Sequence, residues 1–534
     1  MNEFLRTLVA AGVCALGASG VASAAPPAAP APSQSERLRA LDWAPFTAAI
    51  GRFPAERYAA IDTLVAKATI VDVQGAMKGG ALTAEELALY FLSRIRQHDE
   101  RLRTILELNP SAIDEARASD ARRKTGSTLG PLDGIPVSLK DNIETAAPMR
   151  TTAGAEILLD HVAPKDAPLV AQLRARGAVI LGKANLSEFA GSITSIPLFG
   201  GSTAIGGQTI NPHGRYPTAG SSSGSAAGVA ARLAMVSVGS ETSGSLISPS
   251  AYNGVVGMKP SLARVDGTGV VPLISYNDSP GPIARTVTDA AALLDAIDTV
   301  SVDYVAGLRT DALDGVTVGM LNKDIAANPE NTPLLQAASG TLVALGARLR
   351  PAALVDTPAW GTQETFLTYL SAGIRHDMLP YVAARSRTVK TPEDLIAYNA
   401  ADAKRRIPFD QPVLKGLTPL SATMSRADYT ALAMKLRQAA REILEGAFRR
   451  TGAEVLVSFE NTHSPYYATA GFPAITVPLG LRAVGSIIDP LGITNVGMPV
   501  GITFIGKPGD DARLLAFAYA FEQATNLRVL PTLK

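Results

Sequence analysis

Helix-like and strand-like segments alternate between residues 166 and 320, and this alternation limits what the chain can fold into. DAPLVAQLRARG has apolar residues at helical spacing and ends in Gly177, and AVILGKAN follows it as an apolar run typical of a buried strand. SGSAAGVAARLA with MVSVGSE repeats the pattern, as does the helical stretch from Thr288 to Thr299 with GVTVGML. Such units predict a single large α/β domain with a mixed, mostly parallel central sheet covered by helices on both faces.

Segments on either side of this region extend the same architecture. Thr83 begins TAEELALYFLSRI, where Thr83 and Glu86 form a capping box ahead of apolar residues at helical spacing. Near the C-terminus, EVLVSF, AITVPLGL and GITFIG are predicted strands, and ARLLAFAYAFEQAT is a predicted closing helix. Residues of about 320–460 are more helical and irregular and carry no motif. We expect one domain over residues 35–534.

The first residues have the three parts of an export signal. MNEFLR carries Arg6, a run of small apolar residues follows, and Ala22-Ser23-Ala24 supplies the small side chains that a signal peptidase needs. We therefore predict a signal peptide over residues 1–24 and a Pro/Ala linker over residues 25–34. The apolar run is too short for a stable membrane span. The expected location is the periplasm or the outside of the cell, with no stable membrane insertion once the signal is removed.

Net charge, cysteine count and the motifs that the sequence lacks exclude several classes of function. The formal net charge is +1, which gives no electrostatic footprint for nucleic acid. The only cysteine, Cys14, lies within the predicted signal, so disulfides, thiolate catalysis and cysteine-based metal sites are not expected. The sequence contains no H-E-x-x-H, Walker or dinucleotide motif. We expect neither a cofactor nor a metal.

A serine- and glycine-rich stretch, GSSSGSAAGVAARLAMVSVGSETSGS, spans residues 220–245 and raises the question of a nucleophile. Its start matches G-x-S-x-G around Ser222, the elbow of hydrolases that use a downstream histidine, and His463 is a candidate partner. A different base is Lys140, at the end of the apolar strand GIPVSLK. This lysine is either a surface group or a buried amine that is neutral at working pH, and its local sequence alone favours the surface group.

Three stretches of the sequence, in order, resemble a known family. This resemblance bears on the choice between His463 and Lys140 as the base. LDGIPVSLKDNIET, AGSSSGSAAGVAA and GSETSGSLISPSAYNGVVGMKPS resemble the characteristic blocks of the amidase signature family, and ATAGFPAITVPLG with GMPVGITFIG resembles its C-terminal part. The resemblance implies a catalytic core over about residues 80–300 and 465–525, with about 320–460 forming a variable pocket region. Stretches such as LRTILELNP and DLIAYN resemble peptide amidases within that family.

The resemblance also implies roles for particular residues. Ser245 would be the nucleophile, Lys140 the neutral base, and Ser221 the bridge between them, with a cis peptide bond at Gly220-Ser221. Such a relay forms and hydrolyses an acyl-enzyme without a cofactor. An oxyanion hole would come from the backbone N–H groups of Thr242, Ser243, Gly244 and Ser245. The supporting residues would be Gly220, Ser222 and Ser225.

Departures from the family pattern leave the substrate and some alternatives open. Glu241 and Ser243 replace an Asp and a Gly of D-x-G-G-S, and Ser248 stands where many members have an arginine for a substrate carboxylate. We expect an amidohydrolase for a neutral carboxamide: a peptide C-terminal amide, an aryl amide or an alkyl amide. The alternatives are an amidotransferase A-type subunit that works with partners, an esterase or acylamidase, and a non-catalytic binding protein. Oligomeric state is not predicted.

Overall fold

The computed structural model describes residues 39, 41–194, 200–214, 216–326, 331–482 and 497–533. The predicted signal peptide and the Pro/Ala linker lie outside the described residues. Among those residues, no helix has both the length and the apolar character needed to cross a membrane.

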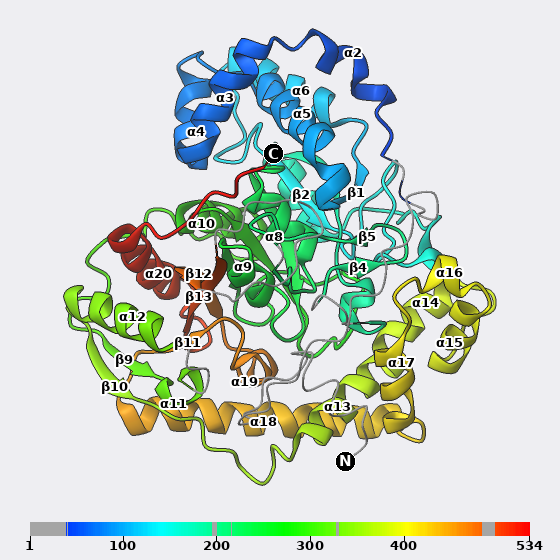
Figure 1. Ribbon diagram of the computed structural model, residues 1–534, viewed down its shortest axis with the longest axis vertical. Helices are drawn as coiled ribbons and strands as arrows, with labels where there is room; N and C mark the ends of the chain where they lie inside the picture. Colours follow the sequence, from blue (N-terminus) through cyan, green and yellow to red (C-terminus); the bar gives the residue numbers. More distant parts are fainter. Residues whose placement is uncertain are drawn as a thin grey trace.

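The described residues are organised around one sheet of eleven strands (Figure 1). In sheet order the strands are β1 (Ile105–Leu108), β3 (Val179–Ala184), β2 (Pro136–Lys140), β6 (Val236–Glu241), β8 (Ser279–Ala284), β7 (Val256–Lys259), β12 (Ala474–Arg482), β13 (Met498–Ile505), β11 (Val455–Phe459), β9 (Thr317–Met320) and β10 (Arg348–Pro351). Parallel pairing occurs in two blocks, β3-β2-β6 and β11-β9-β10, and the strands between them pair antiparallel. The prediction of a single α/β domain on a mixed sheet is confirmed, and its parallel part is confined to these two blocks.

Helices cover the two faces of the sheet, and β6 shows how the sequence separates them. Val236 and Val238 belong to the same buried apolar cluster as the leucines of α10 (Val287–Ile297). Gly239 faces the opposite side, where a Cβ would come within 2.8 Å of Ser222 and 2.7 Å of Leu246. This alternation is the period of two expected of a strand between two layers. The second layer contains α8 (Ser223–Ala230) and α9 (Ile247–Tyr252), which pack against each other.

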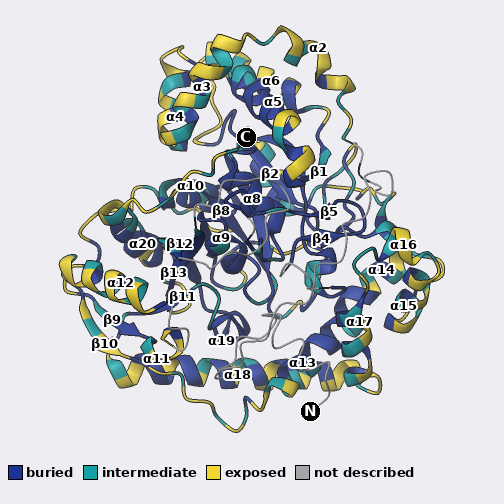
Figure 2. Ribbon diagram, in the orientation of Figure 1, coloured by how far each residue is buried: buried dark blue, intermediate teal, exposed yellow. Residues whose placement is uncertain are grey.

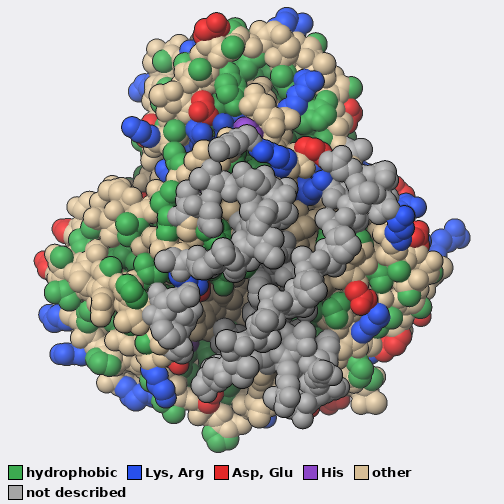
Figure 3. Space-filling view, viewed as in Figure 1, with side chains coloured by type: hydrophobic (Ala, Val, Ile, Leu, Met, Phe, Trp, Pro, Cys, Tyr) green, Lys and Arg blue, Asp and Glu red, His purple; other side chains and the backbone are tan. Residues whose placement is uncertain are grey.

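Further helices surround this centre, and Figure 2 shows buried residues in the middle of the molecule and exposed ones at its rim. At one end lie α2 (Ala44–Arg52), α3 (Ala55–Lys67), α4 (Ile70–Lys78), α5 (Ala84–Leu102) and α6 (Ala112–Lys124). The remaining helices are α7 (Pro168–Ala175), α11 (Asn322–Ile325), α12 (Thr332–Ala344), α13 (Gln363–Gly373), α14 (Leu379–Arg385), α15 (Pro392–Ala400), α16 (Ala403–Arg406), α17 (Pro412–Leu417), α18 (Arg426–Thr451), α19 (Ser464–Ala470) and α20 (Asp511–Thr525). On the face shown in Figure 3, cationic and anionic side chains of the described residues are interspersed.

The predicted capping box opens α5 and gives a stability prediction. Thr83 Oγ1 accepts a hydrogen bond from the Glu86 amide at 3.1 Å, and the Glu86 carboxylate accepts one from the Thr83 amide at 3.0 Å. Thr83→Ala removes the first of these and should lower the free energy of unfolding by about 1 kcal/mol in urea denaturation. Thr63→Ala, at an exposed position of α3, is the control and should change it by less than about 0.5 kcal/mol. Equal losses in both variants would contradict the capping argument.

Candidate active site

Lys140 ends β2 in the interior of the parallel block, between β3 and β6, and its side chain has no exposed surface. Its Nζ donates to Ser221 Oγ at 2.7 Å, to Ser240 Oγ at 3.0 Å and to the Ser240 carbonyl at 3.1 Å. Burial lowers the pKa of Lys140 to about 7, against the opposing influence of the Asp278 and Glu241 carboxylates. The amine is therefore available in its neutral form near neutral pH.

Ser221 lies in the loop that leads into α8, and the peptide bond before it, Gly220-Ser221, is cis. The Ser187 amide donates to the Ser221 carbonyl at 3.0 Å. A Cβ at residue 220 would lie 2.3 Å from Ser187 Oγ, so only glycine fits this close approach. The loop thereby holds the Ser221 hydroxyl against the Lys140 amine.

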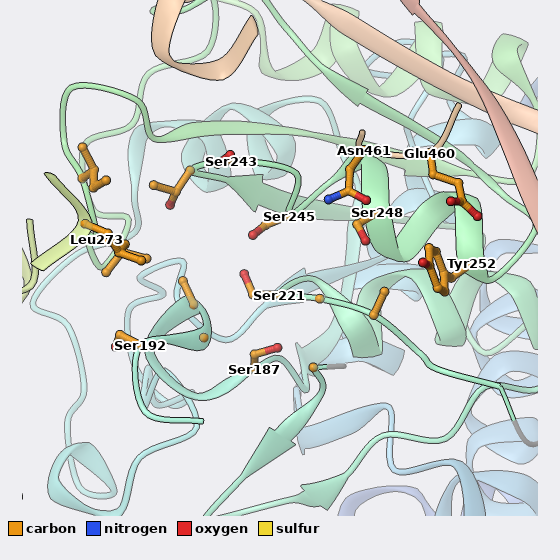
Figure 4. Close-up of a pocket in the computed structure, with 18 of the residues that line it drawn as sticks. Ser187, Ser192, Ser221, Ser243, Ser245, Ser248, Tyr252, Leu273, Glu460 and Asn461 are labelled. Atoms are coloured by element: carbon orange, nitrogen blue, oxygen red, sulfur yellow. The ribbon is translucent and has the colours of Figure 1, made fainter. Parts of the chain in front are cut away.

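Ser245 lies between β6 and α9 and is 7% exposed. The Ser222 amide donates to its carbonyl at 3.1 Å, which joins the two serine-bearing loops. In Figure 4 the hydroxyl groups of Ser221 and Ser245 point toward each other. In the described part of the chain, no hydrogen bond joins these two hydroxyls. The structure brings the three residues Lys140, Ser221 and Ser245 to one place.

The loop over residues 242–245 bends between β6 and α9. Gly244 has φ +82°, and a Cβ there would come within 2.8 Å of Asn461 Nδ2, so glycine is required on both counts. None of the amides of residues 242–245 donates a hydrogen bond to a described residue. The next two amides, of Leu246 and Ile247, are both bound by the Glu241 carboxylate, at 2.8 and 3.1 Å. Four N–H groups are thus left open at the residues for which the sequence predicted an oxyanion hole.

Two residues that sequence reasoning missed support this geometry. Ser240 binds Lys140 through both its hydroxyl and its carbonyl. Asp278 accepts from Thr242 Oγ1 at 2.5 Å with one oxygen, and from the Leu273 and Ile274 amides at 2.8 and 3.2 Å with the other. Burial raises the pKa of Asp278 to about 7. Of these two residues, only Ser240 could have been found from the sequence, because it lies on the strand that follows the serine-rich helix.

The other serines of the stretch have local partners. Ser222 Oγ donates to the Ser240 carbonyl at 3.1 Å, and Ser223 Oγ donates to the Ala219 carbonyl at 2.6 Å. Ser225 Oγ is buried without a hydrogen-bond partner among the described residues. Ser222 therefore does not bind the Lys140 amine directly.

The histidine proposed as a partner for Ser222 is engaged elsewhere. His463 Nδ1 hydrogen bonds with Ser458 Oγ at 2.6 Å, and Nε2 lies 3.2 Å from Asp324 Oδ2. No histidine is among the described residues that line the cavity at the serines. Across the described residues, no group of three or more His, Cys, Asp or Glu side chains has the arrangement of a metal site.

Ser221 and Ser245 border a cavity of about 230 Å³ (Figure 4). Ser248, the residue found in place of the family's arginine, also lines it. Apolar walls come from Leu273, Ile274, Phe366 and Leu370, the last two from α13 within the predicted pocket region. Polar lining residues near Ser248 are Tyr252, Glu460 and Asn461. The candidate nucleophile thus lies between an apolar part and a polar part of one cavity.

Comparison with known proteins agrees with this fold. A family model described as Amidase matches residues 86–515. The chain is 34% identical over 491 residues to a probable amidase of Arabidopsis thaliana, covering 88% of this chain and 92% of that protein. It is 33% identical over 494 residues to the A-type subunit of the glutamyl-tRNA(Gln) amidotransferase of Myxococcus xanthus, covering 85% and 96%.

Solved structures extend the likeness to three dimensions. An amidase family protein from Bacillus anthracis superposes with a TM-score of 0.84 at 32% identity, covering 94% of this chain and 100% of that one. Native peptide amidase from Stenotrophomonas maltophilia superposes with a TM-score of 0.78 at 35% identity, covering 88% and 99%. The chain belongs to the amidase family, the family of the amidase signature, and is an amide-hydrolysing enzyme.

Proposed function

We propose that this enzyme hydrolyses neutral carboxamides to the acid and ammonia or an amine, with Lys140, Ser221 and Ser245 as its catalytic residues. The observation that carries the proposal is the 2.7 Å hydrogen bond from the buried Lys140 amine to Ser221 Oγ. An amine that is neutral near pH 7 can accept a proton, which an exposed lysine cannot do to a useful extent.

In the proposed mechanism, protons move along the three side chains in one direction and then back. Neutral Lys140 takes the Ser221 proton while Ser221 takes the Ser245 proton, and Ser245 Oγ bonds to the amide carbon. The C–N bond then breaks, and the leaving nitrogen receives the proton through the same relay. Water, deprotonated in the same way, attacks the acyl carbon. The bond to Ser245 Oγ then breaks, and Ser245 regains its proton from Lys140 through Ser221 as the acid leaves.

The amides of residues 242–245 are the proposed oxyanion donors. Thr242, Ser243 and Ser245 line the cavity and Gly244 lies among them, so N–H donors without a described partner would lie beside the developing negative charge. Asp278 positions this turn through Thr242. The lining of the cavity contains no Lys or Arg among the described residues, so a free substrate carboxylate close to the reacting bond finds no fixed cation.

The proposed substrates are peptide C-terminal amides, aryl amides and alkyl amides. The likeness to peptide amidase, which has been solved with the competitive inhibitor chymostatin, supports the first of these. Leu273, Ile274, Phe366 and Leu370 offer an apolar wall for the hydrocarbon part of such a molecule. We further propose that the enzyme is exported, on the basis of its first 24 residues.

A second candidate function is that of one component of an amidotransferase. It is favoured by the 33% identity to the Myxococcus xanthus amidotransferase protein over most of both chains. The export signal proposed above disfavours it, because aminoacyl-tRNA is absent outside the cell. The two functions differ in whether the purified chain hydrolyses amides by itself.

The test is a panel of peptide amides, anilides and short aliphatic amides, assayed for release of ammonia or amine by the purified mature chain. The proposed function expects turnover of at least one class without a partner protein. Activity that appears only when glutamyl-tRNA and partner proteins are added would favour the amidotransferase. A folded enzyme that hydrolyses no member of the panel would overturn the proposal.

A further inference from the structure

One end of the cavity carries a carboxylate that the proposed chemistry does not use. Glu460 lines the cavity together with Tyr252 and Asn461, and it is the only Asp, Glu, Lys or Arg among the described lining residues. Figure 4 shows Ser248 between Ser245 and this end, so Glu460 lies beyond the reacting centre. A charged group in a mostly enclosed cavity is costly unless it has a partner.

The backbone of Glu460 is fixed in an uncommon conformation. Its φ is +49°, in the left-handed region that side chains other than glycine, asparagine and aspartate rarely adopt. The Glu460 amide donates to the Gly501 carbonyl at 2.8 Å, and Thr503 Oγ1 donates to the Glu460 carbonyl at 2.7 Å. Strand β13 therefore holds this residue in place, and such conformations are frequent where a side chain must be aimed at a site.

The carboxylate is only half satisfied. Arg482 Nη2 donates to Glu460 Oε1 at 3.1 Å and to Asn331 Oδ1 at 2.7 Å. Oε2 accepts no hydrogen bond from any residue that the structure describes. Arg482 is not among the lining residues, so a molecule in the cavity meets the carboxylate and not the guanidinium. Burial raises the pKa of Glu460 although Arg482 opposes this effect.

Tyr252 completes this end of the cavity. The nearby Glu460 carboxylate is the main cause of the raised pKa of Tyr252, which keeps its hydroxyl protonated. Among the described residues, this end therefore offers a carboxylate oxygen without a hydrogen-bond partner beside a neutral hydroxyl and the Asn461 amide. These groups suit a ligand that donates hydrogen bonds, and an ammonium group suits them best because its hydrogen bond to the carboxylate is charge-assisted.

We propose that Glu460 is a specificity-determining residue that binds a hydrogen-bond donor on the substrate, preferably an ammonium group, while the apolar wall holds the rest of the molecule. This inference rests on the proposed function, because it concerns the substrate of the same site. It predicts that the enzyme prefers amides bearing an ammonium group at some distance from the reacting carbonyl over amides of the same shape without one.

The experiment compares ω-aminoalkanamides of increasing chain length with alkanamides in which a methyl group replaces the ammonium group. For the wild type, kcat/KM should favour the ammonium compound at one chain length or more. Glu460→Gln keeps the shape of the side chain and should reduce that preference at least about tenfold, mainly through a higher KM for the ammonium compounds. The control is Glu454→Gln, a surface residue paired with Arg513, which should leave the preference unchanged.

A second measurement does not depend on the variant folding. Alkylammonium ions should inhibit the wild type competitively against a neutral alkanamide, and alkanols of equal length should inhibit it at least about tenfold less. The inference is overturned if the wild type hydrolyses alkanamides but shows neither the preference nor the inhibition. If the wild type hydrolyses no amide at all, the proposed function fails first, and the two failures are thereby distinguished.

Discussion

Replacing Ser245 by alanine is expected to lower kcat/KM for amide hydrolysis by at least about 10⁴-fold while leaving the fold intact. The variant lacks the oxygen that bonds to the amide carbon, and neither Ser221 nor Ser243 occupies its place in the turn. The turn itself should persist, because the Ser222 amide binds the Ser245 carbonyl and not its hydroxyl. Substrate binding, measured with the inactive variant, should stay within about threefold of the wild type KM.

Ser222→Ala is the matched control, because Ser222 is the serine that a histidine-dependent elbow would use. Its hydroxyl donates to the Ser240 carbonyl, so its loss should weaken activity without abolishing it. A fluorophosphonate probe should label the wild type and Ser222→Ala at Ser245 and leave Ser245→Ala unlabelled. Labelling at Ser222, or full turnover by Ser245→Ala, would show that the assignment of the nucleophile is wrong.

Local sequence patterns were sufficient to predict helices and strands around the site. The apolar run before Lys140 is the strand β2, and the segment predicted as a helix from Thr288 to Thr299 is α10, Val287–Ile297. The predicted capping box at Thr83 is present with both of its hydrogen bonds. These features depend on residues a few places apart, and their physical signals are therefore contained in short stretches of sequence.

The polar groups around the site could not be predicted from short stretches of sequence. Asp278 reaches Thr242 across 36 positions, and Ser240 reaches Lys140 across 100. Both contacts exist because β6 pairs with β2 on one side and with β8 on the other, an order that no local pattern specifies. Glu460 enters the cavity from a loop after β11, and its place depends on the pairing of β11 with β13, which no local pattern specifies either. The sequence predicts which residues can react. The strand order decides which polar groups lie next to those residues.

Lys140 itself illustrates this division. Its local sequence favours a surface lysine over a buried base, and only the family resemblance favoured the second. In the structure the ambiguity is resolved by the neighbouring strands, because β3 and β6 flank β2 and leave the amine with no exposed surface. Whether Lys140 is a surface group or a buried amine therefore depends on the neighbouring strands more than on the residues next to it in the sequence.

Lys140→Met is expected to lower kcat/KM by at least about 10³-fold at pH 8, because the apolar side chain cannot accept the Ser221 proton. In the wild type the lysine must be neutral to act. With its pKa at about 7, kcat/KM should rise about tenfold per pH unit below pH 7 and become constant above it. The variant should lack this rise, and its residual activity is measured over the same pH range. Methionine is similar in length to lysine and brings no charge into the buried site, so the variant should fold.

Lys259→Met is the matched control for the loss of a buried lysine. Lys259 is also fully buried, and its pKa is lowered to about 8, but it donates to the Pro260 and Phe472 carbonyls and to no serine. Both variants remove a group that binds fewer protons when folded than when unfolded. Each should therefore reduce the loss of stability as pH falls toward the folded pKa, which urea denaturation measures.

Of these two lysine variants, only Lys140→Met should remove the rise of kcat/KM below pH 7, which is the acidic limb of the rate profile. Asp278→Asn should keep the limb and move it to lower pH, because the Asp278 carboxylate raises the pKa of Lys140. The amide oxygen of the substituted side chain can still accept from Thr242, so the turn that bears the open amides should persist. A limb that survives in Lys140→Met, or that disappears in Asp278→Asn alone, would assign the titrating base to Asp278 and remove the lysine from the mechanism.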